Sequence, residues 1–531
     1  MQASPRTYTS TMMMEPAPLS SSPVLICLLL LLLPIVLYFV YRKNNPKRKQ
    51  QQQQQNGPRE LRAYPIVGTL PHFIKNGRRF LEWSSAVMQR SPTHTMILKV
   101  LGLSGTVFTA SPASVEHVLK TRFANYPKGG LVDIQTDFLG HGIFNSDGEE
   151  WQQQRKMASY EFNQRSLRSF VVHAVRFEVV ERLLPLLERA AGAGAAVDLQ
   201  DVLERFAFDN ICRVAFGQDP ACLTEESMGA RQSVELMHAF DVASTIVITR
   251  FVSPTWLWRL MKLLNVGPER RMRKALASIH GYADNIIRER KKKKKKTSGK
   301  DDDLLSRFAD SGEHSDESLR YVITNFILAG RDSSSAALTW FFWLVSTRPE
   351  VQDRISKEIR AARQASATTT GPFGLEELRE MHYIHAAITE SMRLYPPVPI
   401  NARTSTEDDV LPDGTVVGKG WRVIYSAYAM GRMEDAWGKD GEEFRPERWL
   451  DAETGVFRPE APCKYPVFHV GPRMCLGKEM AYIQMKSIVA SVFERFSLRY
   501  LGGDAHPGLQ LAGTLRMEGG LPMHLEINTN K

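Results

Sequence analysis

The chain has 531 residues, 43% hydrophobic and 24% charged, which excludes a largely disordered protein and allows a large core. Its 68 basic and 58 acidic residues give a net charge of +10, but residues 291–296 supply six positive charges and residues 42–49 five. The rest is nearly neutral, so we expect no nucleic-acid partner. Five scattered cysteines, an odd number, indicate a reducing compartment without a disulfide framework.

The N-terminal region predicts a membrane anchor. Residues 1–23 are rich in Ser, Pro and Met and are expected to be disordered. Residues 24–41 carry no charge and are dominated by leucine, a length near the lower limit for crossing a hydrocarbon core of about 30 Å. The basic residues follow this run, which argues against a cleaved signal peptide and places the following domain in the cytoplasm. We therefore expect a single-pass protein of the endoplasmic reticulum membrane.

The remaining pattern predicts a linker and one catalytic domain. Residues 42–71 are basic, then Gln-rich and Pro-rich, as in a spacer, and the domain spans residues 72–531. Short strands are expected at residues 96–100 and 106–109, helices at residues 113–121 and throughout 167–290, and a surface loop at residues 291–303. The predicted fold is mainly α with a smaller β region (α+β).

One long helix is predicted at residues 316–347, capped by Asp316 and ended before Pro349. It would be roughly 45 Å long and is apolar on most sides, as in a helix buried at the centre of a large fold. Gly330 and the following serines interrupt this pattern and weaken the helix. Asp332 beside the hydroxyl of Ser333 would suit a proton relay; a kink for packing alone is the alternative.

A second motif surrounds Cys475. Phe468, Gly471, Arg473 and Gly477 flank it, and residues 478–496 have helical apolar spacing. A cysteine at a helix N-terminus is favoured as a thiolate, and the glycines permit close backbone approach. Haem iron is a partner that needs only one protein ligand. A free buried cysteine is the simpler alternative, and the complete pattern argues against it.

Two further groups involve arginine. Trp151 and Arg155 are four residues apart on one predicted helical face, where the guanidinium could bind an anion. Glu390 and Arg393 are three apart, and Arg448 follows downstream, so the three could form a buried charge network. Taken alone, the first pair would be ordinary packing and the second a surface ion pair.

In this order and combination, the motifs resemble those of the cytochromes P-450, the haem-thiolate monooxygenases. The resemblance covers about residues 60–525. It implies the cofactor heme b (iron protoporphyrin IX), held by Cys475 as axial ligand within a loop that includes Phe468 and Gly471. It also implies electrons from NADPH, delivered by a membrane-bound NADPH-cytochrome reductase.

The resemblance assigns roles to the other motifs as well. Glu390, Arg393 and Arg448 correspond to the structural triad of the family, and Asp332 with Ser333 to the pair that delivers protons for oxygen activation. The haem propionates would be held by Trp151, Arg155, Arg473 and Arg403.

The chain departs from the family pattern at Ser333, where threonine is usual. Serine keeps the hydroxyl but lacks the methyl group that restrains χ1. We expect hydroxylation to be intact, with more leakage to peroxide.

A finer resemblance is to the plant branch that oxidises the terminal carbon of fatty acids and of jasmonoyl-isoleucine. Residues 329–332, 338–344, 408–415 and 428–433 carry it. It implies ω-hydroxylation of a small apolar carboxylate. Both substrates stay open, as does further oxidation of the alcohol to the acid. By family position, the pocket would be lined by Phe326, Ala329, Val398, Ile400 and Leu515. Possible anchors for the substrate carboxylate are Lys128, Arg403 and Arg516.

Two alternatives belong to other functional classes. A haem-thiolate dehydratase or isomerase acting on oxidised lipids would use no dioxygen and should lack the acid–hydroxyl pair. A non-catalytic haem sensor would need neither that pair nor a reductase. The presence of Asp332 and Ser333 favours the monooxygenase.

Overall fold

The computed structural model describes residue 64 and residues 68–98, 105–162, 165–224, 231–296, 305, 306, 308, 315–366, 371–503 and 505–528. The predicted disordered segment and membrane anchor, residues 1–41, lie outside these ranges, as does most of the predicted linker. No helix within the described ranges is long and apolar enough to span a membrane. The helix α2 starts at Leu70, so the folded body begins slightly before the predicted boundary at residue 72.

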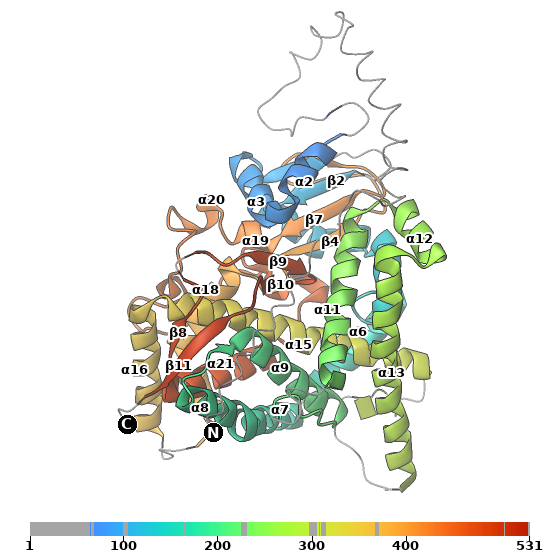
Figure 1. Cartoon of the computed structure of the whole chain (residues 1–531). Coiled ribbons are helices and arrows are strands. Elements are labelled where there is room, and N and C mark those ends of the chain that lie inside the picture. The colour runs from blue at the N-terminus through green and yellow to red at the C-terminus, as the bar shows by residue number, and fades with distance from the viewer. Residues whose placement is uncertain are drawn as a thin grey trace, which may run out of the picture. The chain divides into compact units, whose positions relative to one another are not determined.

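Helices dominate the described residues, which confirms the predicted mainly α class (Figure 1). The α-helices are α2 (Leu70–Asn76), α3 (Phe80–Arg90), α4 (Pro112–Glu116), α5 (Val132–Leu139), α6 (Gly148–Phe162), α7 (Arg165–Glu178), α8 (Leu184–Gly192), α9 (Leu199–Phe216), α11 (Arg231–Val252), α12 (Thr255–Leu264), α13 (Gly267–Lys296), α15 (Asp316–Ser346), α16 (Pro349–Ala365), α17 (Leu375–Glu380), α18 (His382–Leu394), α19 (Ala427–Met430), α20 (Glu434–Trp437) and α21 (Lys478–Arg495). Short 3-10 or π turns are η3 (Gly77–Arg79), η4 (His117–Thr121), η5 (Phe123–Asn125), η6 (Gly129–Leu131), η7 (Val179–Leu183), η8 (Pro446–Trp449), η9 (Pro466–Phe468) and η10 (Gly471–Arg473).

The β region consists of small sheets. Its strands are β1 (Thr95–Leu98), β2 (Thr106–Thr109), β3 (Val197–Asp198), β4 (Ile400–Thr404), β5 (Asp409–Val410), β6 (Val416–Val417), β7 (Arg422–Ser426), β8 (Phe496–Tyr500), β9 (Leu509–Ala512), β10 (Thr514–Met517) and β11 (Pro522–Ile527). The largest sheet has the order β1-β2-β7-β4, in which only the β2–β7 pair is parallel. A second sheet has the order β3-β11-β8, and β9 and β10 form a hairpin. The two predicted N-terminal strands correspond to β1 and β2.

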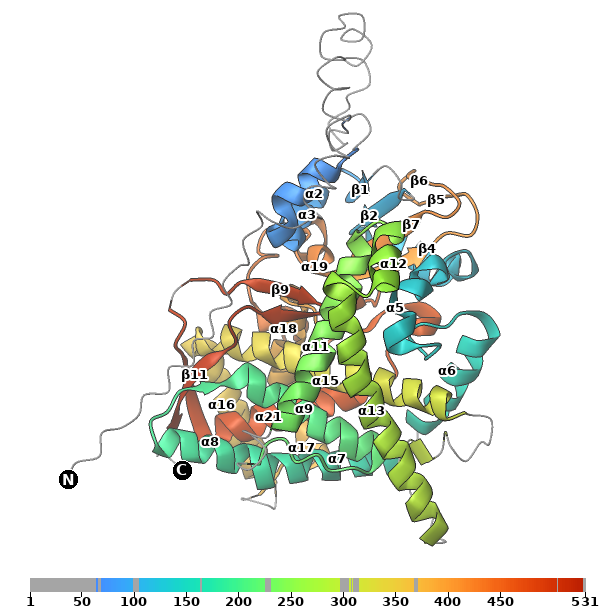
Figure 2. The same ribbon diagram turned by 45° about the vertical axis from the view of Figure 1, so that its right-hand side comes forward.

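The long central helix is α15. In both ribbon views it runs through the middle of the body, between α9 and α21 on one side and the β9–β10 hairpin on the other (Figures 1 and 2). Its cap is Ser315, whose hydroxyl accepts a hydrogen bond from the backbone N–H of Ser318 at 3.1 Å, so the predicted cap at Asp316 is wrong by one residue. The helix stays continuous through the glycine and serines. Gly330 allows close packing, because a Cβ there would lie 2.5 Å from Cγ1 of Ile211 on α9.

The lysine run belongs to a helix. α13 extends to Lys296, so the expected loop at residues 291–303 is wrong for its first six residues. Lysine is a good helix former, and positive charge is favoured near a helix C-terminus.

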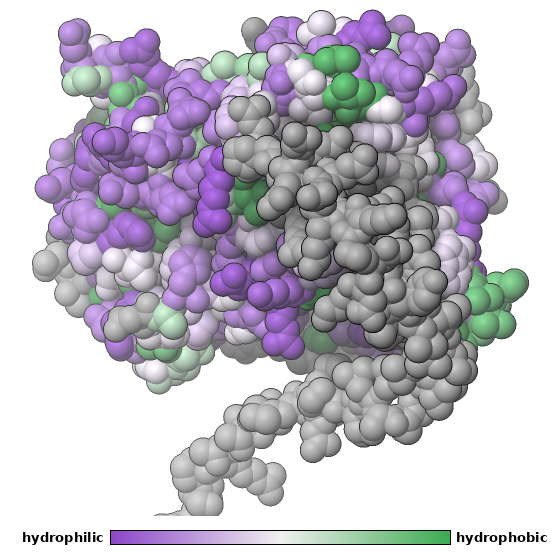
Figure 3. Space-filling model, turned by 90° about the horizontal axis from the view of Figure 1, so that it is seen from above, coloured by the Kyte–Doolittle hydropathy of each residue, from purple (hydrophilic) through white to green (hydrophobic). Residues whose placement is uncertain are grey.

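Two apolar clusters hold the body together. The larger joins α15 with α9, α18 and α21, and the smaller surrounds the β1-β2-β7-β4 sheet. From above, the described residues of the visible face are mainly hydrophilic, and hydrophobic residues form small separate patches (Figure 3). The large apolar side chains are therefore mostly in the interior around α15, where the candidate site also lies.

Candidate active site

The loop before α21 presents Cys475. The backbone N–H of Cys475 donates to the carbonyl of Phe468 at 2.8 Å, which closes the loop around η10. Gly471 has φ +69°, and a Cβ there would lie 2.2 Å from the carbonyl oxygen of Leu119, so only glycine fits. A Cβ at Gly477 would meet only ordinary contacts, the nearest 3.8 Å away, so the predicted steric need for glycine is confirmed at residue 471 and not at residue 477.

The thiol of Cys475 is both accessible and desolvated. The residue is exposed, yet burial raises the pKa of its thiol. The backbone N–H of Gly477 and the charges of Arg155 and Lys478 lower the pKa, but burial outweighs them. The helix N-terminus therefore favours the thiolate, as the sequence predicts, but burial has the larger effect, and coordination of a metal would have to complete the deprotonation.

Basic side chains gather beside Cys475. This cationic cluster contains Lys128, Arg155, Arg403 and Arg473. Arg473 donates to Asp147 at 2.7 Å and to the carbonyl of Ser146 at 2.8 Å, and its guanidinium lies 4.3 Å from the ring centroid of Trp151. Arg155 donates to the carbonyl of Met474, next to Cys475.

The cluster has more positive charge than its protein partners balance. Burial and the charges of Arg403 and Arg473 hold the pKa of Lys128 well below its usual range, and burial lowers that of Arg473 to about 10. Arg403 is fully buried, donates to His469 at 2.7 Å, and its Nε has no hydrogen-bond partner among the described residues. Asp147 is the carboxylate that offsets these charges. An excess of buried cations with an orphaned N–H fits a dianionic ligand, and the two propionates of heme b supply such charge.

One face of α15 is accessible, although most of that helix is buried. Phe326, Ala329, Gly330 and Ser333 are partly exposed, and their spacing places them on a single face. Val398 and Ile400 are partly exposed as well. The fifth predicted pocket residue differs. Leu515 is fully buried in the main core, so the structure assigns it a packing role.

Two aromatic residues near this face were missed by sequence reasoning. Phe162, at the end of α6, stacks on Phe326 with ring centroids 6.1 Å apart, and Phe308 contacts Phe326 edge-on at 6.0 Å. A Cβ at Gly477 would lie 3.8 Å from the Phe162 ring and 4.0 Å from the Cys475 sulfur, so Phe162 lies between the cysteine loop and α15. No local motif marks either phenylalanine, because the contact joins distant segments.

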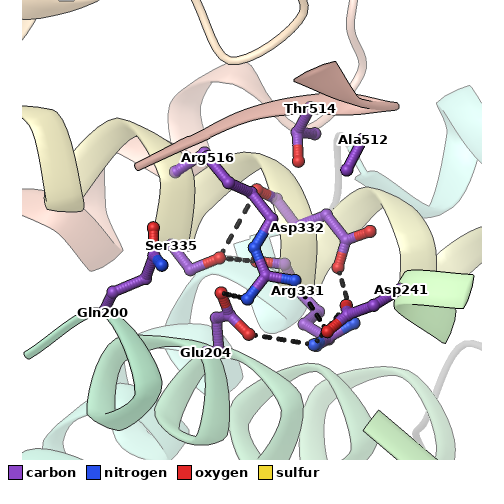
Figure 4. A pocket seen from close by; sticks show the side chains of 10 residues that line it. Gln200, Glu204, Asp241, Arg331, Asp332, Ser335, Ala512, Thr514 and Arg516 are labelled. Carbon is purple, nitrogen blue, oxygen red and sulfur yellow. Dashed lines mark hydrogen bonds and ion pairs between the residues drawn. The ribbon is translucent and has the colours of Figure 1, made fainter. Parts of the chain in front are cut away.

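Asp332 belongs to a buried ionic network that Figure 4 shows from close by. Arg331 contacts Glu204 and Asp241 at 3.0 Å each, and its guanidinium is 3.0 Å from Asp332. Arg516 binds Glu204 at 2.5 Å and Asp241 at 2.6 Å. The residues come from α15, α9, α11 and β10 and point toward one another (Figure 4). Three carboxylates face two arginines, and the remaining void is only about 10 Å³.

Burial and the excess of carboxylates over arginines in this network shift the pKa values of its acids. Burial raises the pKa of Asp332 to about 6, with repulsion from Asp241 adding to the effect, and it raises the pKa of Glu204 to about 7. A carboxyl group with a pKa near neutrality can hold and release a proton under physiological conditions. Beside it, the Ser333 hydroxyl donates to the carbonyl of Ala329 at 2.6 Å. Arg516 already forms ion pairs with two carboxylates of this network, so it is poorly suited to anchor a substrate carboxylate.

Glu390 is the centre of a second buried network. Arg393 donates to both of its carboxylate oxygens at 2.7 Å, and Arg448 donates to one at 2.9 Å. The indole of Trp449 donates at 2.8 Å and the backbone N–H of Arg445 at 2.9 Å. The grouping of the predicted triad is thus present, and Trp449 is a member that the sequence did not indicate.

The comparisons with known proteins agree with this geometry. The family model for cytochrome P450 matches residues 58–517. The chain belongs to the cytochrome P450 family. It is 50% identical over 463 residues to cytochrome P450 CYP94D108 of Paris polyphylla, covering 86% of this chain and 90% of that protein. It is also 44% identical to cytochrome P450 94B1 of Arabidopsis thaliana (83% of this chain, 86% of that one) and to cytochrome P450 94A2 of Vicia sativa (88% and 90%).

These relatives place the chain among the plant CYP94 cytochromes P450. It is therefore a monooxygenase that uses heme b and takes electrons from NAD(P)H through a reductase. The accessible Cys475 and the cationic cluster are the residues that fit this cofactor.

Proposed function

We propose that this P450 hydroxylates the terminal carbon of a small apolar carboxylate, either a fatty acid or jasmonoyl-isoleucine. The observation that carries the proposal is the accessible apolar face of α15, with Phe326 and Ala329 on the same face as Ser333. An apolar wall ending at a proton-bearing pair suits the oxidation of an unactivated C–H bond. Similarity to the CYP94 relatives supports this chemistry.

Cys475 and the cationic cluster would hold the cofactor. Cys475 would provide a sulfur ligand to the iron, and Arg155, Arg403 and Arg473 would bind the propionates, with Lys128 adding positive charge. When bound, the haem supplies the chemistry that reduces dioxygen and passes one oxygen atom to a C–H bond. Because these cations suit the cofactor carboxylates, Lys128 and Arg403 are less suited to anchor the substrate.

Asp332 and Ser333 would supply protons to the oxygen chemistry. The carboxyl of Asp332 faces the buried network, whereas Ser333 lies on the accessible face of α15. A side-chain rotation of Asp332 would bring a proton from the network to the Ser333 hydroxyl. This route keeps the Ser333 hydroxyl on the accessible face and holds the acid in the buried network, roughly 100° further around the helix.

Incubation with substrates tests the proposal. The full-length enzyme in reductase-containing microsomes would be given lauric, palmitic and oleic acids and jasmonoyl-isoleucine, and products identified by mass spectrometry. We expect ω-hydroxylated products that require NADPH, and the same assay measures any further oxidation to the acid. In-chain products only, or rearranged products formed without NADPH, would contradict it. The reduced carbon monoxide complex should show the absorption of a thiolate-ligated haem, which Cys475→Ser should lose.

We also propose that the protein is held on the endoplasmic reticulum membrane with its catalytic domain in the cytoplasm. The uncharged run at residues 24–41 and the basic residues after it support this. On the folded body, α12 exposes Trp256 and Leu263, 61% and 81% accessible, which suits contact with lipid. Recovery of the full chain in the soluble fraction of expressing cells would contradict the anchor. Loss of membrane binding after deletion of residues 1–41 would support it.

A further inference from the structure

A second cavity lies away from the candidate active site. It has a volume of about 280 Å³, lies between α17, α18 and α21, and is open to solvent on one side. Its walls include Leu375, Leu378, His385, Tyr482, Ile483 and Lys486. None of the residues assigned above to haem, proton delivery or substrate lines it.

Much of the wall is apolar or aromatic, and the charged or polar side chains of Arg379, His382, Glu479 and Lys486 complete the lining. The ring of His385 lies between Phe457 and Tyr482, with centroid distances of 4.0 Å and 4.1 Å. Burial lowers the pKa of His385 to about 3, so this ring is neutral. The hydroxyl of Tyr482 is hydrogen-bonded to Thr389 at 2.9 Å. Together with Leu378 on α17, these groups form a surface that suits an apolar or aromatic body.

Among the charged residues that line the cavity, Lys486 is buried, whereas Arg379 and Glu479 are exposed. Lys486 is only 5% exposed, and no hydrogen bond or ion pair joins its ammonium to any residue that the structure describes. The carboxylates that act on it are Glu358 and Glu380, but Glu358 already accepts the backbone N–H groups of Tyr383 at 2.7 Å and Ile384 at 2.8 Å. Burial lowers the pKa of Lys486 to about 8. The Nζ atom of Lys486 is not among the fully buried polar atoms without a hydrogen-bond partner, so it reaches the cavity, where an anion would form a charge-assisted pair with it.

We propose that this cavity is a binding site for a small organic monocarboxylate, distinct from the catalytic site. The carboxylate would pair with the ammonium of Lys486, and the apolar body would lie against Leu378, Ile483 and the ring of Tyr482. A cavity of about 150 Å³ can hold benzene, so the larger volume here accommodates a bicyclic aromatic or a medium-chain acyl group. The positive charge at the inner end selects an anion over a neutral molecule of the same shape.

The site adjoins the cysteine loop. The ring of Tyr482 lies 5.4 Å from that of Phe468, whose carbonyl accepts the N–H of Cys475. A ligand in contact with the Tyr482 ring would therefore be separated by that ring from the loop that carries Cys475.

Binding of 2-naphthoate to the holoenzyme tests the proposal. An imidazole ligand on the haem iron first blocks the catalytic site, and binding is then measured by equilibrium dialysis. We expect one naphthoate per chain, and at least tenfold weaker binding of 2-naphthalenemethanol, which has the same ring system without the charge. Octanoate should compete. No saturable binding, or equal binding of the neutral alcohol, would overturn the proposal.

Variants locate the bound molecule. Lys486→Met should weaken 2-naphthoate binding at least tenfold, and Leu378→Trp should abolish it by filling the cavity. Lys357→Met, at an exposed lysine on the neighbouring α16, is the matched control and should bind as wild type does. Lys486→Met should melt no lower than wild type, because it removes a buried unpaired charge. Unchanged affinity in a folded Lys486→Met protein would refute the site.

Discussion

Asp332 and Ser333, the two residues proposed to deliver protons in this P450, differ in their burial and in their neighbours. Asp332 is 9% exposed and faces two arginines and two other acids, whereas Ser333 reaches the accessible side of α15 and bonds to its own helix. The raised pKa of Asp332, about 6, comes from burial that outweighs the attraction of Arg331. In the proposed route, protons would pass between two adjacent residues whose side chains leave the helix roughly 100° apart.

Replacing the acid should slow product formation. Asp332→Asn removes a proton donor and keeps the size of the side chain, so we expect the rate to fall by about a hundredfold, within the range for loss of acid–base catalysis. Turnover of the purified enzyme with reductase measures this, together with the solvent deuterium isotope effect, which should increase. Asp241→Asn lies in the same network but is distant in sequence from Ser333, so its rate of product formation should fall much less. Equal losses in both variants would show a general effect of the network charge.

Replacing the hydroxyl residue tests the departure from the family pattern. Ser333→Thr adds the methyl group that restrains χ1, so a larger fraction of the consumed NADPH should appear as product and less as hydrogen peroxide. Ser333→Ala, which lacks the hydroxyl, should shift the ratio in the opposite direction. Product and peroxide are measured per NADPH. If wild type already converts all NADPH to product and Ser333→Thr does not improve it, the leakage hypothesis is wrong.

At the level of elements, the network of Glu390 joins α18 to the segment at residues 431–449. Arg393 also donates to the carbonyls of Gly441 at 2.5 Å and Glu443 at 2.9 Å, so one guanidinium satisfies groups from both segments. Both Glu390 and Arg393 are almost completely buried. A buried charge in such a network is strongly destabilising when its partner is lost.

Glu390→Gln should therefore destabilise the protein. Removal of one partner from a buried ion pair costs about 3–5 kcal/mol, so we expect a clearly lower melting temperature and less haem-containing protein. Thermal unfolding and the haem-to-protein ratio measure these effects. Glu447→Gln is the control, since Glu447 pairs with Arg354 at the exposed surface and such pairs contribute at most about 1 kcal/mol. Similar melting temperatures for the two variants would contradict a structural role of the triad.

On the scale of the whole molecule, the acids buried around α15 couple stability to pH. The folded-state pKa values of Glu204 (about 7) and Asp332 (about 6) lie above those of exposed acids, near 4. The folded protein thus binds more protons than the unfolded chain between about pH 4 and pH 7. Its stability from these groups is greatest below pH 4 and is lost as the pH rises through 6 to 7.

Glu204→Gln tests this coupling. The substitution removes one acid and leaves two carboxylates with two arginines, so the penalty from ionisation of Glu204 disappears. We expect the melting temperature of the variant, relative to wild type, to rise between pH 5 and pH 8. Thermal unfolding at several pH values measures the difference, and Glu116→Gln, at an exposed pair with Lys120, should show none. A constant difference across the range would contradict the raised pKa of Glu204.

The sequence by itself determined the features that depend on local spacing. The i,i+4 pair Trp151 and Arg155, the i,i+3 pair Glu390 and Arg393, the adjacent Asp332 and Ser333, and the glycine at residue 471 all lie on short segments. Their geometry follows from helix periodicity and from the steric limits of the backbone. The family membership and the heme cofactor followed from these motifs.

Only the tertiary structure decided which distant groups surround these motifs. The partners of Asp332 come from α9, α11 and β10, far apart along the chain, and no local pattern couples Glu204 or Arg516 to it. Burial, which depends on the whole fold, raised the pKa of Cys475 against the influence of the helix N-terminus. Packing likewise placed Leu515 in the core and left Lys486 in its cavity without a direct partner. Charge balance and desolvation are properties of the assembled interior, and the spacing of residues along the chain does not encode them.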